Sequence, residues 1–92
     1  MVWTSSVVTL GTASVQVVPP DNMPHDITLH NMTKSSNEYI HIGPNSSTTI
    51  NNSIHIDPGE TLTIRLRPTD ELWACSDPDG LVLGIADVRM AD

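Results

Sequence analysis

The chain has 92 residues, a net charge of −7 and a single cysteine, Cys75. A chain of this length forms one domain, and a single cysteine excludes an intrachain disulfide. Four basic residues against eleven acidic ones argue against a phosphate-backbone interface, and no stretch approaches the roughly 20 apolar residues of a membrane helix. We therefore expect neither a nucleic-acid nor a membrane partner.

Short segments in which apolar and polar residues alternate follow one another along the chain. Such period-2 alternation, interrupted by Gly, Pro and Asn clusters, predicts β-strands, and no segment shows helical spacing over three turns. We expect strands at residues 6–10, 13–18, 26–31, 38–42, 53–56, 61–67, 71–75 and 81–88, and a brief edge strand at 48–50.

The clearest β signal is the run from Ile54 to Leu66, in which two alternating segments flank Pro58-Gly59. This pattern is typical of a half-buried antiparallel sheet. Residues 81–86 are apolar at nearly every position, which predicts a strand that is buried on both faces.

Together these segments predict an all-β fold: a single antiparallel β-sandwich of jelly-roll-like type with about eight short strands. We expect residues 1–5 to form an N-terminal arm and residues 6–92 to form the sandwich domain. A domain this small buries a modest share of its surface, so association with further copies is a common means of stabilisation.

Three histidines, His30, His41 and His55, share the non-core parity of their predicted strands. If those strands were neighbours, the imidazoles could converge on zinc, but histidine is also common as a half-exposed sheet residue. The order of the strands in space is not readable from the sequence, and we expect no metal. Cys75 is followed by no histidine, unlike a blue-copper cysteine, and is expected to be a buried or interfacial thiol.

No pattern typical of catalysis emerges. No serine lies in a Gly-x-Ser-x-Gly elbow, and Asp70 and Glu71 are adjacent, so that they point in opposite directions on a strand. Asp77-Pro78-Asp79-Gly80 reads as a tight turn, because the twelfth position of a calcium loop would be Val88 rather than a glutamate. We expect no enzyme and no cofactor.

Three residues stand out as candidate partner contacts: Trp3, Trp73 and Arg65. Trp73 has the parity opposite to Leu72, so it either anchors an interface on the outer face or fills the second face of the sandwich. Trp3, near the terminus, could anchor the arm onto a neighbouring subunit.

Several stretches match a known family in order: Val17-Val18-Pro19, Ile27-Thr28-Leu29-His30-Asn31, Tyr39-Ile40-His41-Ile42-Gly43, Ile56-Asp57-Pro58-Gly59-Glu60-Thr61-Leu62 and Glu71-Leu72-Trp73-Ala74. Over roughly residues 7–88 the chain resembles the small β-sandwich virion proteins encoded among the structural genes of tailed bacteriophages. The shared motifs concern packing and turns. The chain departs from the family pattern at Asp57-Pro58 and at Cys75-Ser76.

The resemblance implies a non-enzymatic protein of the virion, made in the host cytoplasm. It would bind the major capsid protein on the capsid exterior as a decoration or minor capsid protein, in a homo-oligomer for which a trimer is favoured. Two alternatives remain open: a receptor- or glycan-binding module of a tail or fibre, and a head–tail joining component.

Overall fold

The computed structural model describes residues 2–89, which form eight β-strands and no helix that could cross a membrane. The strands are β1 (Val2–Leu10), β2 (Val15–Val18), β3 (His25–Asn31), β4 (Tyr39–Gly43), β5 (Ile54–Ile56), β6 (Thr61–Leu66), β7 (Leu72–Asp77) and β8 (Leu81–Arg89).

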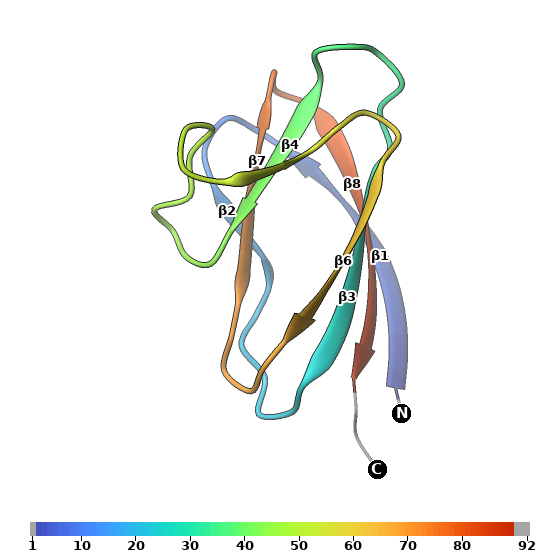
Figure 1. Ribbon diagram of the computed structural model, residues 1–92, viewed down its shortest axis with the longest axis vertical. Coiled ribbons are helices and arrows are strands. Elements are labelled where there is room, and N and C mark those ends of the chain that lie inside the picture. Colours follow the sequence, from blue (N-terminus) through green and yellow to red (C-terminus); the bar gives the residue numbers. More distant parts are fainter. Residues whose placement is uncertain (1, 90–92) are drawn as a thin grey trace.

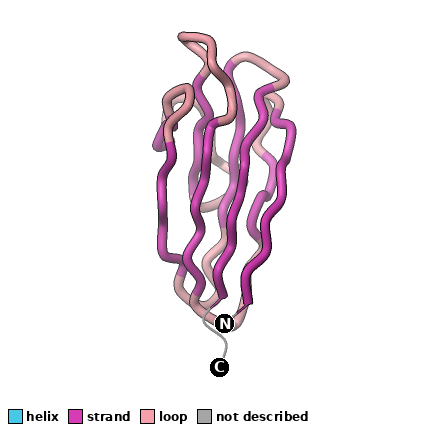
Figure 2. The backbone as a smooth tube through the Cα atoms, turned by 90° about the vertical axis from the view of Figure 1, so that its right-hand side faces the viewer, coloured by secondary structure: helices cyan, strands magenta, loops and turns pink. Residues whose placement is uncertain are grey.

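The strands form two four-stranded antiparallel sheets, which face each other. Their orders are β1-β8-β3-β6 and β2-β7-β4-β5, and the two layers can be followed in Figure 1. The strands run along the long axis of the molecule (Figure 2). Two sheets of four strands in these orders are a jelly roll, the architecture of many viral capsid and lectin domains and of cupins. The predicted fold class is confirmed.

Apolar side chains that alternate along the strands form the core between the sheets. In β3 every second residue is buried, from His25 to Asn31, and the residues between them are half-exposed. Because the chain has no Phe and few other aromatics, the core consists of aliphatic residues: Leu10, Val18, Ile27, Leu29, Ile40, Ile42, Ile56, Leu66, Leu72, Ala74, Leu81, Leu83 and Ile85. β-Branched side chains fit such a pleated surface well.

Asn31 holds together the end of the sandwich where β3 ends. Its buried side-chain amide donates to the carbonyls of Glu38 and Ile56, each at 2.9 Å. Its side-chain oxygen accepts from the backbone N–H and the hydroxyl of Thr33, at 3.1 and 2.7 Å. Its main-chain oxygen accepts from the N–H of Gly59 in the predicted Pro-Gly turn, where Gly59 has a φ of 77°.

Three expectations differ from the structure. Residues 2–5, expected as an arm, continue β1, because the nine residues of β8 offer each of them a partner, from Val2 opposite Arg89 onwards. Residues 48–50 lie in a loop instead of an edge strand, because Thr48 and Thr49 bond within the loop, to Asn45 and Asn52. Finally, β8 is not buried on both faces: its outward residues Val82, Ala86 and Val88 are half-exposed.

Candidate functional site

Two of the three candidate partner residues lie on one face of the molecule. Trp3 is opposite Val88, Val88 is opposite Asp26, and Asp26 is opposite Arg65 in the register of the β1 sheet. These four residues form one outward row across four strands. Trp73 lies on the other sheet, half-buried, and its indole N–H donates to the Glu71 carboxylate. The sequence could not assign the three candidate residues to a face of the molecule, because it does not show the strand order.

The end of this row at β6 is a bidentate ion pair. Arg65 Nε and Nη2 donate to the two carboxylate oxygens of Asp26 at 2.7 and 3.0 Å. The hydrogen bond from Arg65 lowers the pKa of Asp26 against the opposing effect of burial, and the pair raises the pKa of Arg65. Arg65 is therefore already engaged within the chain, and a partner would meet the pair rather than a free cation.

The β1 end of the same face is apolar. Trp3 and Val7 are 71% and 65% exposed, and Met32 is 46% exposed with its sulfur beside Gly84. We call this surface the outer stripe; it consists of Trp3, Val7, Met32, Val82, Ala86 and Val88. The sequence analysis did not identify Val7. The available signal was that Val7 and Trp3 are four residues apart, so that they share a face if both lie in one strand. An exposed apolar patch of this kind on a small domain is typical of an interaction surface.

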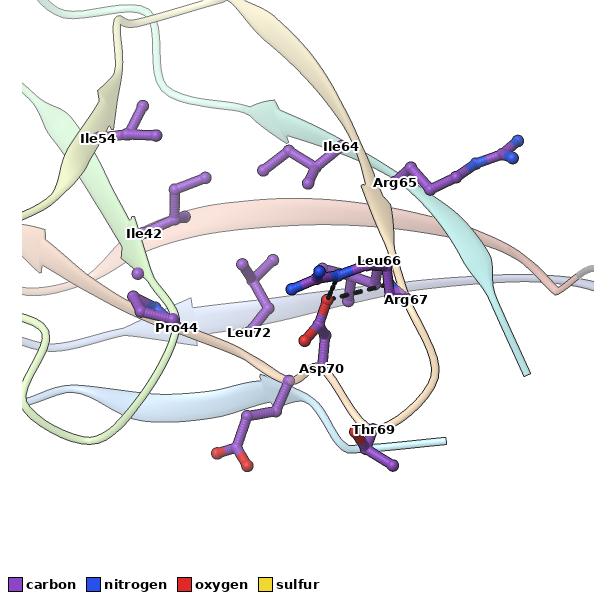
Figure 3. A pocket seen from close by; sticks show the side chains of 12 residues that line it. Ile42, Pro44, Ile54, Ile64, Arg65, Leu66, Arg67, Thr69, Asp70 and Leu72 are labelled. Carbon is purple, nitrogen blue, oxygen red and sulfur yellow. Dashed lines mark hydrogen bonds and ion pairs between the residues drawn. The ribbon is translucent and has the colours of Figure 1, made fainter. Parts of the chain in front are cut away.

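A cleft opens between the sheets on the side where β5 and β6 lie. This cleft has a volume of about 530 Å³, and Ile42, Ile54, Ile64, Leu66 and Leu72 line it (Figure 3). Ile54 has the parity of a core residue but is 62% exposed, because the sheets do not close over it. Figure 3 also shows that Arg65 points away from the cleft.

An ion pair between Arg67 and Asp70 lies at the mouth of the cleft (Figure 3), with the Arg67 Nε 3.2 Å from the Asp70 carboxylate. The backbone N–H of Arg67 donates to the same oxygen, and these contacts lower the pKa of Asp70. An apolar floor with a charged rim can hold an apolar or amphipathic group. The sequence had no signal for the cleft, because its lining comes from segments far apart in the chain.

The three histidines do not converge. His41 and His55 are cross-strand neighbours on the outer face of the β2 sheet, with ring centroids 6.2 Å apart. His30 lies on the other sheet, where its Nδ1 is 3.0 Å from the Thr61 hydroxyl. Within residues 2–89, His, Cys, Asp and Glu side chains form no cluster of three that could hold a metal ion.

Cys75 lies directly opposite His41, so a thiol and an imidazole are neighbours in one row. Burial raises the pKa of the Cys75 thiol, and Asp77 raises it further. Burial, with a smaller effect of His55, lowers the pKa of His41. A nucleophilic cysteine needs the opposite arrangement, a stabilised thiolate beside a charged imidazole. The thiol is buried, as expected, and the row has the character of packing.

Comparison with known proteins shows the fold and no closer relationship. No family model matches the chain, and no curated protein matches it. The chain is similar in structure to a subunit of Bacillus endospore appendages, described as disulfide-linked pili, with a TM-score of 0.57 and 8% identity over 98% of this chain and 88% of that one. It is also similar to a chain of the Nora virus structure, with a TM-score of 0.66 and 8% identity over 95% of this chain and 53% of that one.

A third similar structure is the SPP1 Dit protein, described as a hub of the adsorption apparatus in phages that infect Gram-positive bacteria. Its TM-score is 0.54 at 11% identity, over 96% of this chain and 47% of that one. Cupin domains and a nucleoplasmin-like domain are also similar in structure. Structural and virion proteins thus share this fold with cupins, and the fold by itself leaves the function to the surfaces described above.

Proposed function

We propose that the chain is a non-enzymatic structural protein of a phage virion, which binds the major capsid protein on the capsid exterior as an oligomeric decoration or minor capsid protein. The observation that carries the proposal is the outer stripe, an apolar surface exposed on one outward face of a jelly roll. Such a surface is costly for an isolated chain and is expected where a partner covers it.

Two further observations support a virion role. The order of packing and turn motifs resembles phage virion proteins, and the same fold occurs in the Nora virus structure and in SPP1 Dit. A small acidic module at many symmetric positions gains avidity when its copies are linked, so a modest affinity at each site suffices. The resemblance favours a trimer as the linked unit.

Within this proposal Trp3 is the central contact. Tryptophan is enriched among the residues that dominate binding energy, and Trp3 is the most exposed large apolar residue among those described. The Asp26–Arg65 pair at the other end of the row would form part of the polar rim. Trp73 would contact a different neighbour, because it lies on the opposite sheet.

The test is to mix the purified protein with capsids that lack it and to image them by cryo-electron microscopy. Density at regular positions on the capsid surface is expected, and it should be lost with Trp3→Ala, which removes an exposed side chain without changing the core. Arg65→Ala is expected to weaken binding less. Bare capsids with the unmodified protein would contradict the proposal.

The cleft favours one of the alternatives, a receptor- or glycan-binding module of a tail or fibre. Its apolar floor and charged rim resemble a ligand site in composition, whereas the scarcity of aromatic residues argues against sugar stacking. Binding to a glycan array that is abolished by Ile54→Asp and unaffected by Trp3→Ala would favour this alternative. A head–tail joining role would instead place the density at the portal vertex.

A further inference from the structure

We propose that two copies of the chain pair through β1, strand against strand, in an antiparallel two-fold dimer. The proposal goes beyond the capsid role and holds whatever the dimer binds. It concerns the β1 edge; Trp3 and Val7 lie at that edge and would be partly covered by the second copy, whereas the rest of the outer stripe stays exposed for a capsid partner.

The first argument is the chemistry of the β1 edge. β1 is the last strand of its sheet, and among the described residues β8 is its only hydrogen-bonded neighbour. It pairs with β8 over nine residues without a register shift, and its sequence, Val-Trp-Thr-Ser-Ser-Val-Val-Thr-Leu, has no charge and no proline. Native proteins usually block such an edge with charges, proline, bulges or short strands, because it accepts another strand readily.

The second argument is that the other three described edges carry such features. The opposite edge of the same sheet, β6, carries Arg65 in its ion pair with Asp26. In the other sheet, β5 has three residues. β2 has four, with a register irregularity between Gln16 and Val18, and it is followed by Pro19-Pro20. The long, neutral, regular edge of β1 is therefore an exception within the described structure, and its best complement in length and charge is another β1.

The third argument is the fit of β1 to itself. Antiparallel pairing about a two-fold axis at Ser6, the middle of Val2–Leu10, brings all nine residues into register. Ser5 would then lie opposite Val7 of the partner subunit, and Trp3 opposite Thr9 of the partner subunit. Trp3 would also be a diagonal neighbour of the partner subunit's Val7, a separation of about 7–8 Å that an aromatic side chain can span.

This geometry covers the two most exposed apolar side chains on the described surface. Trp3 and Val7, 71% and 65% exposed in the single chain, would meet twice in each dimer, once on either side of the axis. An isologous contact of this kind is self-complementary and needs no second surface. A trimer would have to use another part of the molecule.

The fourth argument is electrostatic. Each copy carries a net charge of −7, so most orientations of two copies repel. β1 itself carries no charged residue. Carboxylates around it have partners within the chain: Asp87, opposite Thr4 on β8, lies 3.0 Å from His25, Asp26, two strands away, is bound by Arg65, and Asp79 accepts from the Thr12 N–H. The β1 edge is thus an approach that buries no unpaired charge.

The expected affinity follows from the size of the contact. One strand pair with two tryptophans lies at or below the lower end of stable interfaces, about 1,200 Å² in total. We therefore expect a micromolar dissociation constant. Sedimentation equilibrium of the full chain should show a shift from the 10.0 kDa monomer to a species of twice that mass as the concentration rises.

Val7→Lys is the decisive variant. It places two lysines close to the two-fold axis without touching the core, and it should abolish the dimer while leaving the circular dichroism spectrum and the melting temperature of the monomer nearly unchanged. Val15→Lys is the matched control, because Val15 is an exposed valine on another edge strand, β2; it should leave the dimer intact. A monomer at all concentrations, or a trimer unaffected by Val7→Lys, would overturn the proposal.

A covalent test remains informative if Val7→Lys fails to fold. Ser6→Cys places one thiol per chain at the axis, and mild oxidation should link two chains rapidly, since the native Cys75 is buried. Thr63→Cys on the β6 edge is the control and should link slowly. Equal rates for the two variants would contradict β1 pairing. Both experiments use the protein without capsids, so their outcome is independent of the capsid proposal.

Discussion

Asn31 illustrates how much of this fold depends on one polar residue. Its buried side chain makes four hydrogen bonds, which join the end of β3 to the loop that follows it and to β5. These four bonds use the full hydrogen-bonding capacity of a side-chain amide, with two donated and two accepted. One of these contacts, the bond to the Ile56 carbonyl, is fully buried.

Asn31→Ala should lower the free energy of unfolding by about 2–4 kcal/mol, because it removes the buried donor to the Ile56 carbonyl and the shorter of the two bonds to the Glu38 carbonyl. Urea denaturation would measure the effect, and the m-value should be unchanged. Asn51→Ala is the comparison, an exposed loop residue whose replacement should change the stability by less than about 0.5 kcal/mol. Similar values for the two variants would contradict the role of Asn31.

Thr69 adopts an unfavourable backbone conformation, with a φ of 70°. It follows Pro68 in a turn closed by a hydrogen bond from the Asp70 N–H to the Arg67 carbonyl, and the position after proline in such a turn favours glycine. A β-branched residue at positive φ is strained, by about 1–3 kcal/mol.

Thr69→Gly should therefore stabilise the protein by about 0.5–1 kcal/mol, after subtraction of the greater flexibility of glycine in the unfolded chain. Gly59→Ala is the mirror experiment: Gly59 has a φ of 77° with open space around the position of a Cβ, so alanine there should destabilise the protein by about 1 kcal/mol through backbone strain alone. Thermal melts of the two variants should shift in opposite directions.

At the scale of elements, the loop from Pro44 to Ser53 is held by short-range contacts of its own. Thr48 packs so closely on Gly43, at the end of β4, that a Cβ on Gly43 would overlap the Thr48 side chain. His41 Nδ1 lies 3.1 Å from the Ser53 hydroxyl, and the Ser14 hydroxyl donates to the Ser46 carbonyl. The loop is thereby fixed at both ends and tied to the start of β2.

Gly43→Ala should destabilise the protein by about 1–3 kcal/mol through this overlap. Gly43→Ala should cost less stability in a Thr48→Gly background than in the unmodified protein, because the overlapping Thr48 atoms are gone. A double-mutant cycle measured by urea denaturation gives the coupling. Strictly additive effects would show that the two residues do not meet.

The sequence was sufficient for the elements that alternate and end at a turn. The Pro58-Gly59 turn and the buried side of β3 follow from local chemistry, and both are confirmed. The edge strand expected at residues 48–50 was wrong because threonine side chains bonded within the loop, a competition that β propensity ignores. Strand order depends on contacts between distant segments, so neither the separation of His30 from His41 nor the cleft could be predicted.

At the scale of the whole molecule, the free energy of unfolding should decrease in two separate steps as the pH is lowered. The pKa of His41 is lowered from 6.5 by burial, so the unfolded chain takes up the proton first and stability falls as the pH drops below about 6.5. The pKa values of Asp26 and Asp70 lie below 3.8 through their hydrogen bonds, so their contribution is complete above that value and is lost as the pH falls below it.

Two variants separate the steps. His41→Gln should flatten the decline in unfolding free energy just below pH 6.5 and leave the acid step, whereas Asp26→Asn should weaken the acid step alone. Urea titrations at several pH values would measure both. A slope below pH 6.5 that persists in His41→Gln would assign it to another group.

Charge also sets how two copies meet. With −7 on each chain, added salt should strengthen the β1 pair by a few-fold as the screening length falls to about 10 Å at 0.1 M and 3 Å at 1 M. Sedimentation at increasing sodium chloride would measure this. A dimer that weakens with salt would be held by opposite charges and so would lie elsewhere on the surface.

The difference between the β1 edge and the other sheet edges limits how far such an assembly can grow. A subunit with two open edges has a valency of two and can polymerise into a fibre of indefinite length. Among the described edges of this chain, β2, β5 and β6 carry features that discourage pairing, which leaves a valency of one. Pairing through β1 therefore uses the one edge that is open to it, so strand pairing stops at two chains and no fibre forms.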